Sequence, residues 1–383
     1  MASTCGLIST DFEVALIGFI TLTTPSEHPG AAVIPSALAV AQETNAGGLD
    51  LLAAVVASYE VCTRIGASEW RPAYHTGNWS GFGAATAAAR LRGLSAEQLM
   101  HALAITAYHG PRIADLTLSS DMGANVKESI PWSVVTGLNA ADLAAQGFTG
   151  CRDALDIDER FEPGRATADL GDGFQIMNTY FKRYSACRWI HSAVEALLQV
   201  MTEHGLSAEY IDSVHVETFL QAASLDNLAD PPSPESAQYS LPYCLGIAAS
   251  KGDNALMPMA ADDLHDPAAV AFANKVTVTC NDALAADFPV TVPARVIVHT
   301  QSGVFEAQVD LPWGEPDGPT GHADLVAKFR ALAAQRIDEN RTTAIVAAVE
   351  NLKHGPLYPL LDLLSPPADN DIVALEAKRH TAG

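Results

Sequence analysis

The hydrophobic pattern changes character close to residue 182, and this change constrains the fold more than any other feature. Before it, Ala-rich stretches with helical periodicity alternate with short connections that contain Gly or Pro. After it, segments such as "SVHVETFL" and "KVTVTC" alternate polar and apolar residues with the period of a β-strand. The order of these segments predicts a mainly helical fold with an α+β part, in which the large domain is all-helical.

Several helices of the first part can be placed by their ends. Residues 51–65 are apolar on most faces, which predicts a central helix. Ser95 and Gln98 form a capping-box pattern before another helix. Pro131 stands where a first helical turn accepts proline, and the helix that it begins should end at Gly147.

The second part contains helices as well as strands. We expect a helix near residues 192–204 and a hairpin that turns at residues 301–303. Residues 312–321 are rich in Pro and Gly and are typical of a linker, and two amphipathic helices too short to fold alone follow them. These helices should return to the first domain, so the predicted division is a helical domain from residues 1–184 and 322–383 and an inserted α+β lid domain from residues 185–321.

Composition excludes several classes of protein. The 383-residue chain carries a net charge of −23 with no basic stripe, which argues against nucleic acid and against an anionic membrane surface. Six cysteines without a CxxC pair do not suggest disulfides or a zinc site, and they fit a cytoplasmic protein. The apolar run at residues 14–22 is too short to span a bilayer and has no basic region before it, so it predicts a buried helix.

Four basic residues share one kind of position. Each lies where a Gly- or Pro-containing loop meets a small-residue helix: His28, His75, Lys127 and Lys182. Unpaired backbone N–H groups at the start of a helix favour anions. A histidine or lysine added there can hold a carboxylate and move a proton, so these four are the candidate site residues.

His75 has two interpretations. It precedes a stretch that contains Gly77, Gly81 and Gly83. If this stretch is a loop, its glycines let the backbone approach a ligand closely. The alternative is a surface turn in which the backbone satisfies the histidine. Within that stretch, Gly81 and Gly83 also suit close helix packing.

The sequence evidence for the other three candidates differs from residue to residue. His28 precedes a helix, which should lower its pKa and favour the neutral imidazole that a general base needs. Most lysines are solvated, but Lys182 lies among aromatic residues in "YFKRYSACRW", where loss of water could tune it. Lys127 has no such context, and His191 is interpreted as a packed core histidine.

Other chemistries lack their motifs. The sequence has no GxSxG, no Walker loop, no GxGxxG after a strand and no HExxH. A metal bound by His28 and His75 would lack an acidic residue at ligand spacing, and an iron–sulfur cluster would lack grouped thiolates. We therefore expect neither a metal nor a cofactor.

Taken together, the segments resemble the MmgE/PrpD family of 2-methylcitrate dehydratases, cis-aconitate decarboxylases and iminodisuccinate epimerases. The resemblance rests on "HPGAAVIPSALAVAQ", "SYEVCTRIG", "YHTGNWSGFGAATAAARLRGLSAEQL", "GLNAADLAAQGFTG", "FKRYSACRWIH" and "EPDGPTGHADLVAKF", which stand in the family order. It implies a helical domain formed from both chain ends, an α+β lid, a homodimer, no cofactor and a site for a di- or tricarboxylate. It further implies that His28 and His75 are catalytic and that Lys127 and Lys182 bind substrate.

Two departures from the family pattern qualify this expectation. The family normally begins with a further helical stretch, which this sequence lacks or has in shortened form, so we expect an N-terminally short member. The stretch "GFITLTTPSE" before His28 also lacks the acidic cluster that is usual in the family. The expected function is a cofactor-independent lyase that abstracts an α-proton from a polycarboxylate, as a dehydratase or decarboxylase. The alternatives are an epimerase or isomerase that uses the same site, and a non-catalytic carboxylate-binding or scaffold protein.

Overall fold

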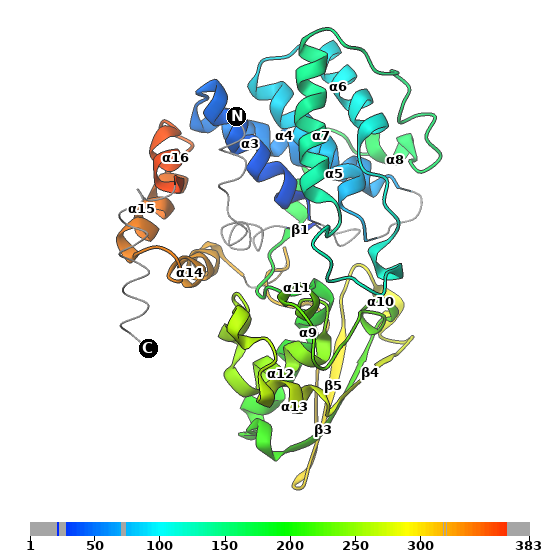
Figure 1. The fold of residues 1–383 in the computed structure, drawn as a ribbon, viewed down its shortest axis with the longest axis vertical. Helices are drawn as coiled ribbons and strands as arrows, with labels where there is room; N and C mark the ends of the chain where they lie inside the picture. Colours follow the sequence, from blue (N-terminus) through cyan, green and yellow to red (C-terminus); the bar gives the residue numbers. More distant parts are fainter. Residues whose placement is uncertain (1–20, 23–27, 70–73, 317, 319, 366–383) are drawn as a thin grey trace.

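The computed structural model describes residues 21–22, 28–69, 74–316, 318 and 320–365. Five helices of the N-terminal half lie together at one end of the molecule (Figure 1): α3 (Pro29–Thr44), α4 (Gly48–Ala67), α5 (Gly77–Leu91), α6 (Ala96–His109) and α7 (Ile130–Ala145). The long central helix expected from residues 51–65 is α4. Helix α5 packs against each of the other four.

Glycine allows α5 to lie close to its neighbours. A Cβ added at Gly81 would lie 2.9 Å from the backbone oxygen of Ser133 in α7, and one at Gly83 would lie 2.8 Å from Val33 in α3. The interpretation of Gly77, Gly81 and Gly83 as a ligand-binding loop is therefore wrong, because all three lie in the first two turns of α5. Tight packing offsets the roughly 1 kcal/mol by which glycine weakens a helix interior relative to alanine.

The predicted helix ends of this half are confirmed. The Ser95 hydroxyl accepts a hydrogen bond from the Gln98 backbone N–H, and the Ser95 backbone N–H donates to the Gln98 side-chain oxygen, before α6 begins. Pro131 lies in the first turn of α7, and Gly147 follows the end of that helix with a φ of 84°.

The prediction of a helix at residues 14–22 is wrong for the two residues of that range that the structure describes, Thr21 and Leu22. Strand β1 (Thr21–Leu22) pairs antiparallel with β2 (Thr179–Tyr180), so these two residues are extended. Pairing with a distant strand replaces the local hydrogen bonds of a helix. Residues 14–20 lie outside the described part.

The second half combines helices with a four-stranded sheet. Its helices are α9 (Arg188–His204), α10 (Leu220–Ala223), α11 (Pro234–Ala237), α12 (Leu241–Lys251) and α13 (Pro267–Ala273). The sheet has the order β4 (Val276–Cys280), β3 (Ile211–Thr218), β5 (Ala294–Thr300) and β6 (Gly303–Val309). Strands β3 and β4 are parallel and the other pairs antiparallel, with the predicted hairpin between β5 and β6.

Shorter elements connect these layers. They are helix α8 (Pro163–Thr167) and the 3₁₀ turns at Leu116–Leu118, Gln175–Asn178, Ala208–Tyr210, Asp253–Leu256, Ala261–Asp263 and Ala285–Asp287.

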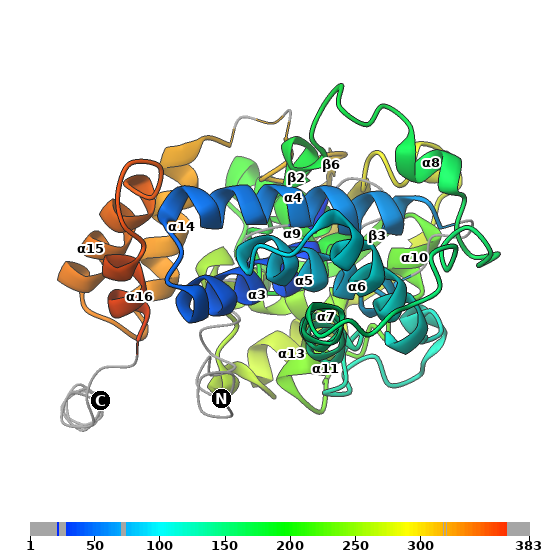
Figure 2. The same ribbon diagram turned by 90° about the horizontal axis from the view of Figure 1, so that it is seen from above.

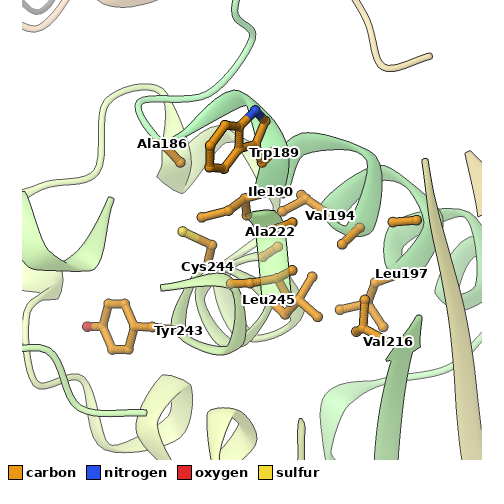
Figure 3. Packing of buried hydrophobic residues seen from close by; sticks show 14 of the residues in the cluster. Ala186, Trp189, Ile190, Val194, Leu197, Val216, Ala222, Tyr243, Cys244 and Leu245 are labelled. Carbon is orange, nitrogen blue, oxygen red and sulfur yellow. The ribbon is translucent and has the colours of Figure 1, made fainter. Parts of the chain in front are cut away.

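The core of the second half forms around α9 (Figure 3). Ile190, Val194 and Leu197 are fully buried and contribute to one apolar cluster with Val216 of β3 and Leu245 of α12. Their spacing of four and three residues places them on one face of the helix. Burial of each such side chain contributes about 1.5–3 kcal/mol to the free energy of folding. Helix α9 is therefore held in place by its packing, and it fixes the position of the residues just before it.

The last helices lie beside the first ones (Figures 1 and 2). They are α14 (His322–Ala333), α15 (Glu339–Glu350) and α16 (Tyr358–Leu364). Ile345, Leu357 and Leu360 share an apolar cluster with Ala37 of α3 and Leu51 of α4. The mainly helical architecture with an α+β part is thus confirmed, whereas the domain boundaries at residues 184 and 322 stay a prediction.

Two further observations concern the described residues only. Their cysteines are all free: Cys62, Cys151, Cys187, Cys244 and Cys280. Within the same ranges, no helix combines the length and the apolar character needed to cross a membrane.

Candidate functional site

Three helices begin at one place in the molecule. The first residues before α3, α5 and α7 are joined by hydrogen bonds: the His28 backbone N–H donates to the Thr76 hydroxyl (3.2 Å), and the Thr76 N–H donates to the Glu128 carboxylate (2.9 Å). The Thr76 hydroxyl donates to the same carboxylate oxygen of Glu128. Thr76 therefore links the start of α3 to the residues just before α7.

A strained turn presents Lys127 and Glu128. Lys127 and Ser129 adopt positive φ angles of 48° and 59°, a conformation that costs non-glycine residues on the order of 1–3 kcal/mol. The Gly77 N–H donates to the Glu128 carbonyl oxygen at 3.0 Å and helps to hold this turn. Such strain persists only where the surrounding contacts determine the backbone, and it commonly accompanies functional sites.

Substitution of Gly77 by alanine should damage this turn. The new Cβ would lie 2.0 Å from the Glu128 carbonyl oxygen, so the backbones of α5 and of the turn must separate. We expect Gly77→Ala to lower the free energy of unfolding by about 1–3 kcal/mol, measured by urea denaturation. Gly164→Ala is the control, because a Cβ there meets nothing within 4 Å; equal losses for the two variants would contradict the prediction.

His28 lies at the centre of the cluster. Its Nε2 is 3.4 Å from Oε1 of Glu128 and 3.2 Å from the Tyr74 hydroxyl oxygen. Burial, and then the charges of Lys182 and Lys127, hold the pKa of His28 well below its usual value. The imidazole is therefore neutral at pH 7 and able to accept a proton.

The two lysines share this environment. Lys127 Nζ donates to Oε1 of Gln238 at 3.4 Å and lies 5.3 Å from the centre of the Tyr239 ring. Burial lowers the pKa of Lys127 to about 8. Burial also lowers the pKa of Lys182, which lies between β2 and α9.

Glu128 is the carboxylate among these cations. Its side chain is 3% exposed, and burial raises its pKa although the Thr76 hydrogen bonds, Lys182 and Lys127 favour the charged form. Burial thus opposes the charge of this carboxyl group, while its hydrogen bonds and the two lysines support it.

Tyr74, from the first half of the chain, and Tyr239, from the second half, lie against each other beside this cluster. The Tyr74 ring packs edge-on against Tyr239, 6.2 Å between centres, and against Trp189 of α9 at 5.2 Å. Burial raises the pKa of both tyrosines well above the usual value, so both hydroxyl groups keep their protons and can donate. Sequence reasoning missed both, because neither has a distinctive spacing.

Lys328 joins the cluster from α14, near the other end of the chain. Its Nζ donates to the backbone carbonyl of Lys182, and burial followed by the charge of Lys182 lowers its pKa to about 7. Sequence reasoning missed this residue too. The available signal was its place on the apolar face of α14, between Leu325 and Leu332.

His75 has different charged neighbours. Its Nε2 lies 3.4 Å from Oε2 of Glu69, and the pKa of that carboxyl group is raised to about 7 by burial. The pKa of His75 is lowered by burial, with Asp115 and Arg160 as the charged side chains that act on it. The structure thus brings His28, Lys127 and Lys182 together and pairs the His75 side chain with Glu69; the catalytic role of His75 stays a prediction.

The core interpretation of His191 is confirmed. The residue is 1% exposed, its ring centre lies 5.0 Å from that of Tyr184, and Nε2 lies 3.4 Å from the Ala186 carbonyl oxygen. As for metals, a grouping of three or more His, Cys, Asp or Glu side chains suited to an ion is not found among the described residues.

Fold and site together define a helical protein with an α+β module and a buried cluster of cations where the two meet. Family models agree with this class: the MmgE/PrpD N-terminal domain matches residues 21–164, and the MmgE/PrpD C-terminal domain matches residues 184–354. The chain belongs to the MmgE/PrpD family.

Several relatives align with most of this chain at low identity. The cis-aconitate decarboxylase of Aspergillus terreus is 23% identical, with 90% of this chain and 78% of the relative aligned. The human cis-aconitate decarboxylase is also 23% identical, over 92% of this chain and 79% of the relative. The mouse cis-aconitate decarboxylase is 24% identical, over 86% of this chain and 71% of the relative.

Proposed function

We propose that this protein is a cofactor-independent lyase that acts on a small di- or tricarboxylate by moving a proton at the carbon next to a carboxylate. The observation that carries the proposal is that Lys127 and Lys182 both act electrostatically on buried His28, which stands at the start of α3. The kinship with cis-aconitate decarboxylases supports a tricarboxylate of that kind as substrate.

The chemistry follows from the charges. Lys127 and Lys182 attract substrate carboxylates, and the backbone N–H groups at the helix starts add to this attraction. Neutral His28 takes the α-proton, and the Tyr239 hydroxyl group can donate to the negative charge that develops. The carbanion then expels hydroxide or takes the proton back on its other face. In a decarboxylation, CO₂ leaves instead of the proton, and the electron pair that it leaves behind takes up a proton at carbon from solvent through the same site.

The test is proton exchange in deuterium oxide. The wild-type protein is incubated with cis-aconitate, with a hydroxylated tricarboxylate and with a dicarboxylate, and NMR follows deuterium entry and product formation. Exchange with release of CO₂ or water supports the lyase. Exchange with inversion alone supports the epimerase alternative, and binding without exchange supports the non-catalytic one; either outcome overturns the proposal.

Ligand binding should weaken as the pH rises through about 8, the pKa of Lys127. Only the ammonium form attracts a carboxylate, and a bound carboxylate raises the pKa of that lysine in the complex. The dissociation constant of a non-reacting tricarboxylate, measured by calorimetry, should be lowest below pH 8 and rise by up to about tenfold per pH unit above it. Lys127→Met should weaken binding at pH 7 and flatten this dependence, whereas replacement of the exposed Lys353 should do neither.

A cytoplasmic homodimer belongs to the same proposal. Helix α7 exposes large apolar side chains on one face, with Trp132 at 64%, Leu143 at 41% and Val135 at 39%. Light scattering should give a dimer mass at micromolar concentration. Trp132→Glu should shift it to a monomer, and Leu220→Glu, at an exposed apolar residue of α10, should not; a monomeric wild type would contradict the homodimer.

A further inference from the structure

We propose that Glu128 is a positioning residue that sets the tautomer of His28, holding the proton on Nε2 so that Nδ1 is the nitrogen that accepts the substrate proton. The inference deepens the proposed function and rests on it for the role of His28 as base. Glu128 itself would not touch the substrate.

The hydrogen bonds of Glu128 give the first argument. One carboxylate oxygen, Oε2, already accepts the N–H and the hydroxyl of Thr76, while the other, Oε1, faces His28 Nε2 at 3.4 Å. Oε1 accepts nothing from Thr76, and its charge lies at ion-pair distance from Nε2, where it attracts a proton on that nitrogen. A carboxylate in this position stabilises the tautomer whose proton lies on the nitrogen that faces it.

Tyr74 gives the second argument, because it favours the same tautomer. Its hydroxyl oxygen lies 3.2 Å from His28 Nε2, and the hydroxyl has two other acceptors for its own proton, the Cys187 sulfur at 4.0 Å and the Tyr239 hydroxyl. The hydroxyl oxygen can then accept from Nε2–H. A neutral imidazole with its proton on Nε2 carries its lone pair on Nδ1.

Rigidity gives the third argument. The His28 backbone N–H is held by the Thr76 hydroxyl, which also binds Glu128, so imidazole and carboxylate share one anchor. The other charged or titratable groups that act on His28 are Lys127, in the turn before α7, and Lys182, in the loop before α9. Both lysines oppose protonation of His28, so the carboxylate orients a neutral base and does not make it a cation.

The tautomer can be read in the wild-type protein without any substrate. Long-range ¹H–¹⁵N correlation of the imidazole at pH 7 should place the proton of His28 on Nε2. In Glu128→Gln, the amide oxygen can keep the Thr76 hydrogen bonds while its NH₂ group faces Nε2 as a donor, so the proton should move to Nδ1. A wild-type proton on Nδ1, or the same tautomer in both proteins, overturns the inference.

Kinetics give a second readout once a substrate is in hand. A wrong tautomer in a comparable histidine–carboxylate pair lowers kcat by about 10⁴. We expect Glu128→Gln to lower kcat by at least about 10² with far less change in KM. In a His28→Gln background, the same substitution should cause no further loss; additive losses would overturn the inference.

A control variant at Glu195 separates the change in the His28 tautomer from a general effect of removing a buried carboxyl group. Glu195 of α9 is also a partly buried carboxyl group with a raised pKa, and it accepts hydrogen bonds from the Trp313 backbone N–H. Glu195→Gln should leave the His28 tautomer and kcat unchanged; an equal change in this variant would overturn the inference. If wild-type protein exchanges no polycarboxylate proton, the proposed function fails, and the wild-type tautomer still decides the inference.

Discussion

Replacement of His28 by glutamine should lower the turnover of a polycarboxylate by about 10² to 10⁴, the usual contribution of a positioned acid–base group. The expected effect is large because His28 is neutral and lies beside the two lysines that would hold the substrate. Glutamine keeps a polar side chain of similar reach, so KM should change much less than kcat. Exchange in deuterium oxide measures the chemical step directly, and calorimetry measures binding.

His75→Gln is the matched comparison, because His75 was also predicted to be catalytic. Its side chain pairs with Glu69 and is acted on by Asp115 and Arg160, so we expect a smaller loss of exchange than for His28→Gln. The reverse order, with binding retained in both variants, would identify His75 as the base and contradict the assignment to His28.

Replacement of Arg188 by leucine should lower the free energy of unfolding by about 3–5 kcal/mol, because it leaves a buried carboxylate without its partner. Arg188, the first residue of α9, and Glu315 are 3% and 4% exposed in their side chains. Arg188 Nε donates to Oε1 of Glu315 at 3.1 Å, and the guanidinium lies 3.9 Å from the centre of the Tyr180 ring. The pair ties the segment before α14 to the start of α9.

Urea denaturation checks this prediction with two further variants. The double variant Arg188→Leu/Glu315→Leu should recover most of the lost stability, since no charge is then left buried alone. Arg152→Leu removes an ion pair with Glu97 in which both side chains are more than 60% exposed, and it should cost within about 1 kcal/mol. A single Arg188→Leu no more costly than the double variant would contradict the argument.

The elements that could be predicted are those defined by short-range patterns. The capping box at Ser95, the proline at the start of α7 and the hairpin between β5 and β6 depend on residues within a few positions of one another. Such signals survive in a single sequence because local backbone geometry decides them. The helix-start pattern likewise holds for His28 and Lys127, which stand just before α3 and α7, whereas Lys182 lies in the loop between β2 and α9.

Where local patterns mislead, a distant part of the chain is the cause. The apolar stretch that ends at Leu22 was expected to be a helix, yet its described residues pair with a strand almost 160 positions away. The glycines before Ala84 suggest a loop, yet they form a helix because α3 and α7 lie against them. In both cases contacts with distant segments accompany the backbone conformation that the short-range reading missed.

The amino-acid sequence alone was enough for the mainly helical class and the family, and it proposed three of the residues that lie together at the candidate site. Only the tertiary structure decided that Glu128 lies against His28, that Lys328 reaches Lys182 from α14, and that the His75 side chain pairs with Glu69. The physical reason is that burial and the approach of charges set the pKa values and partners of these groups. Both depend on how segments separated by tens to hundreds of residues pack together, and local sequence patterns do not encode that packing.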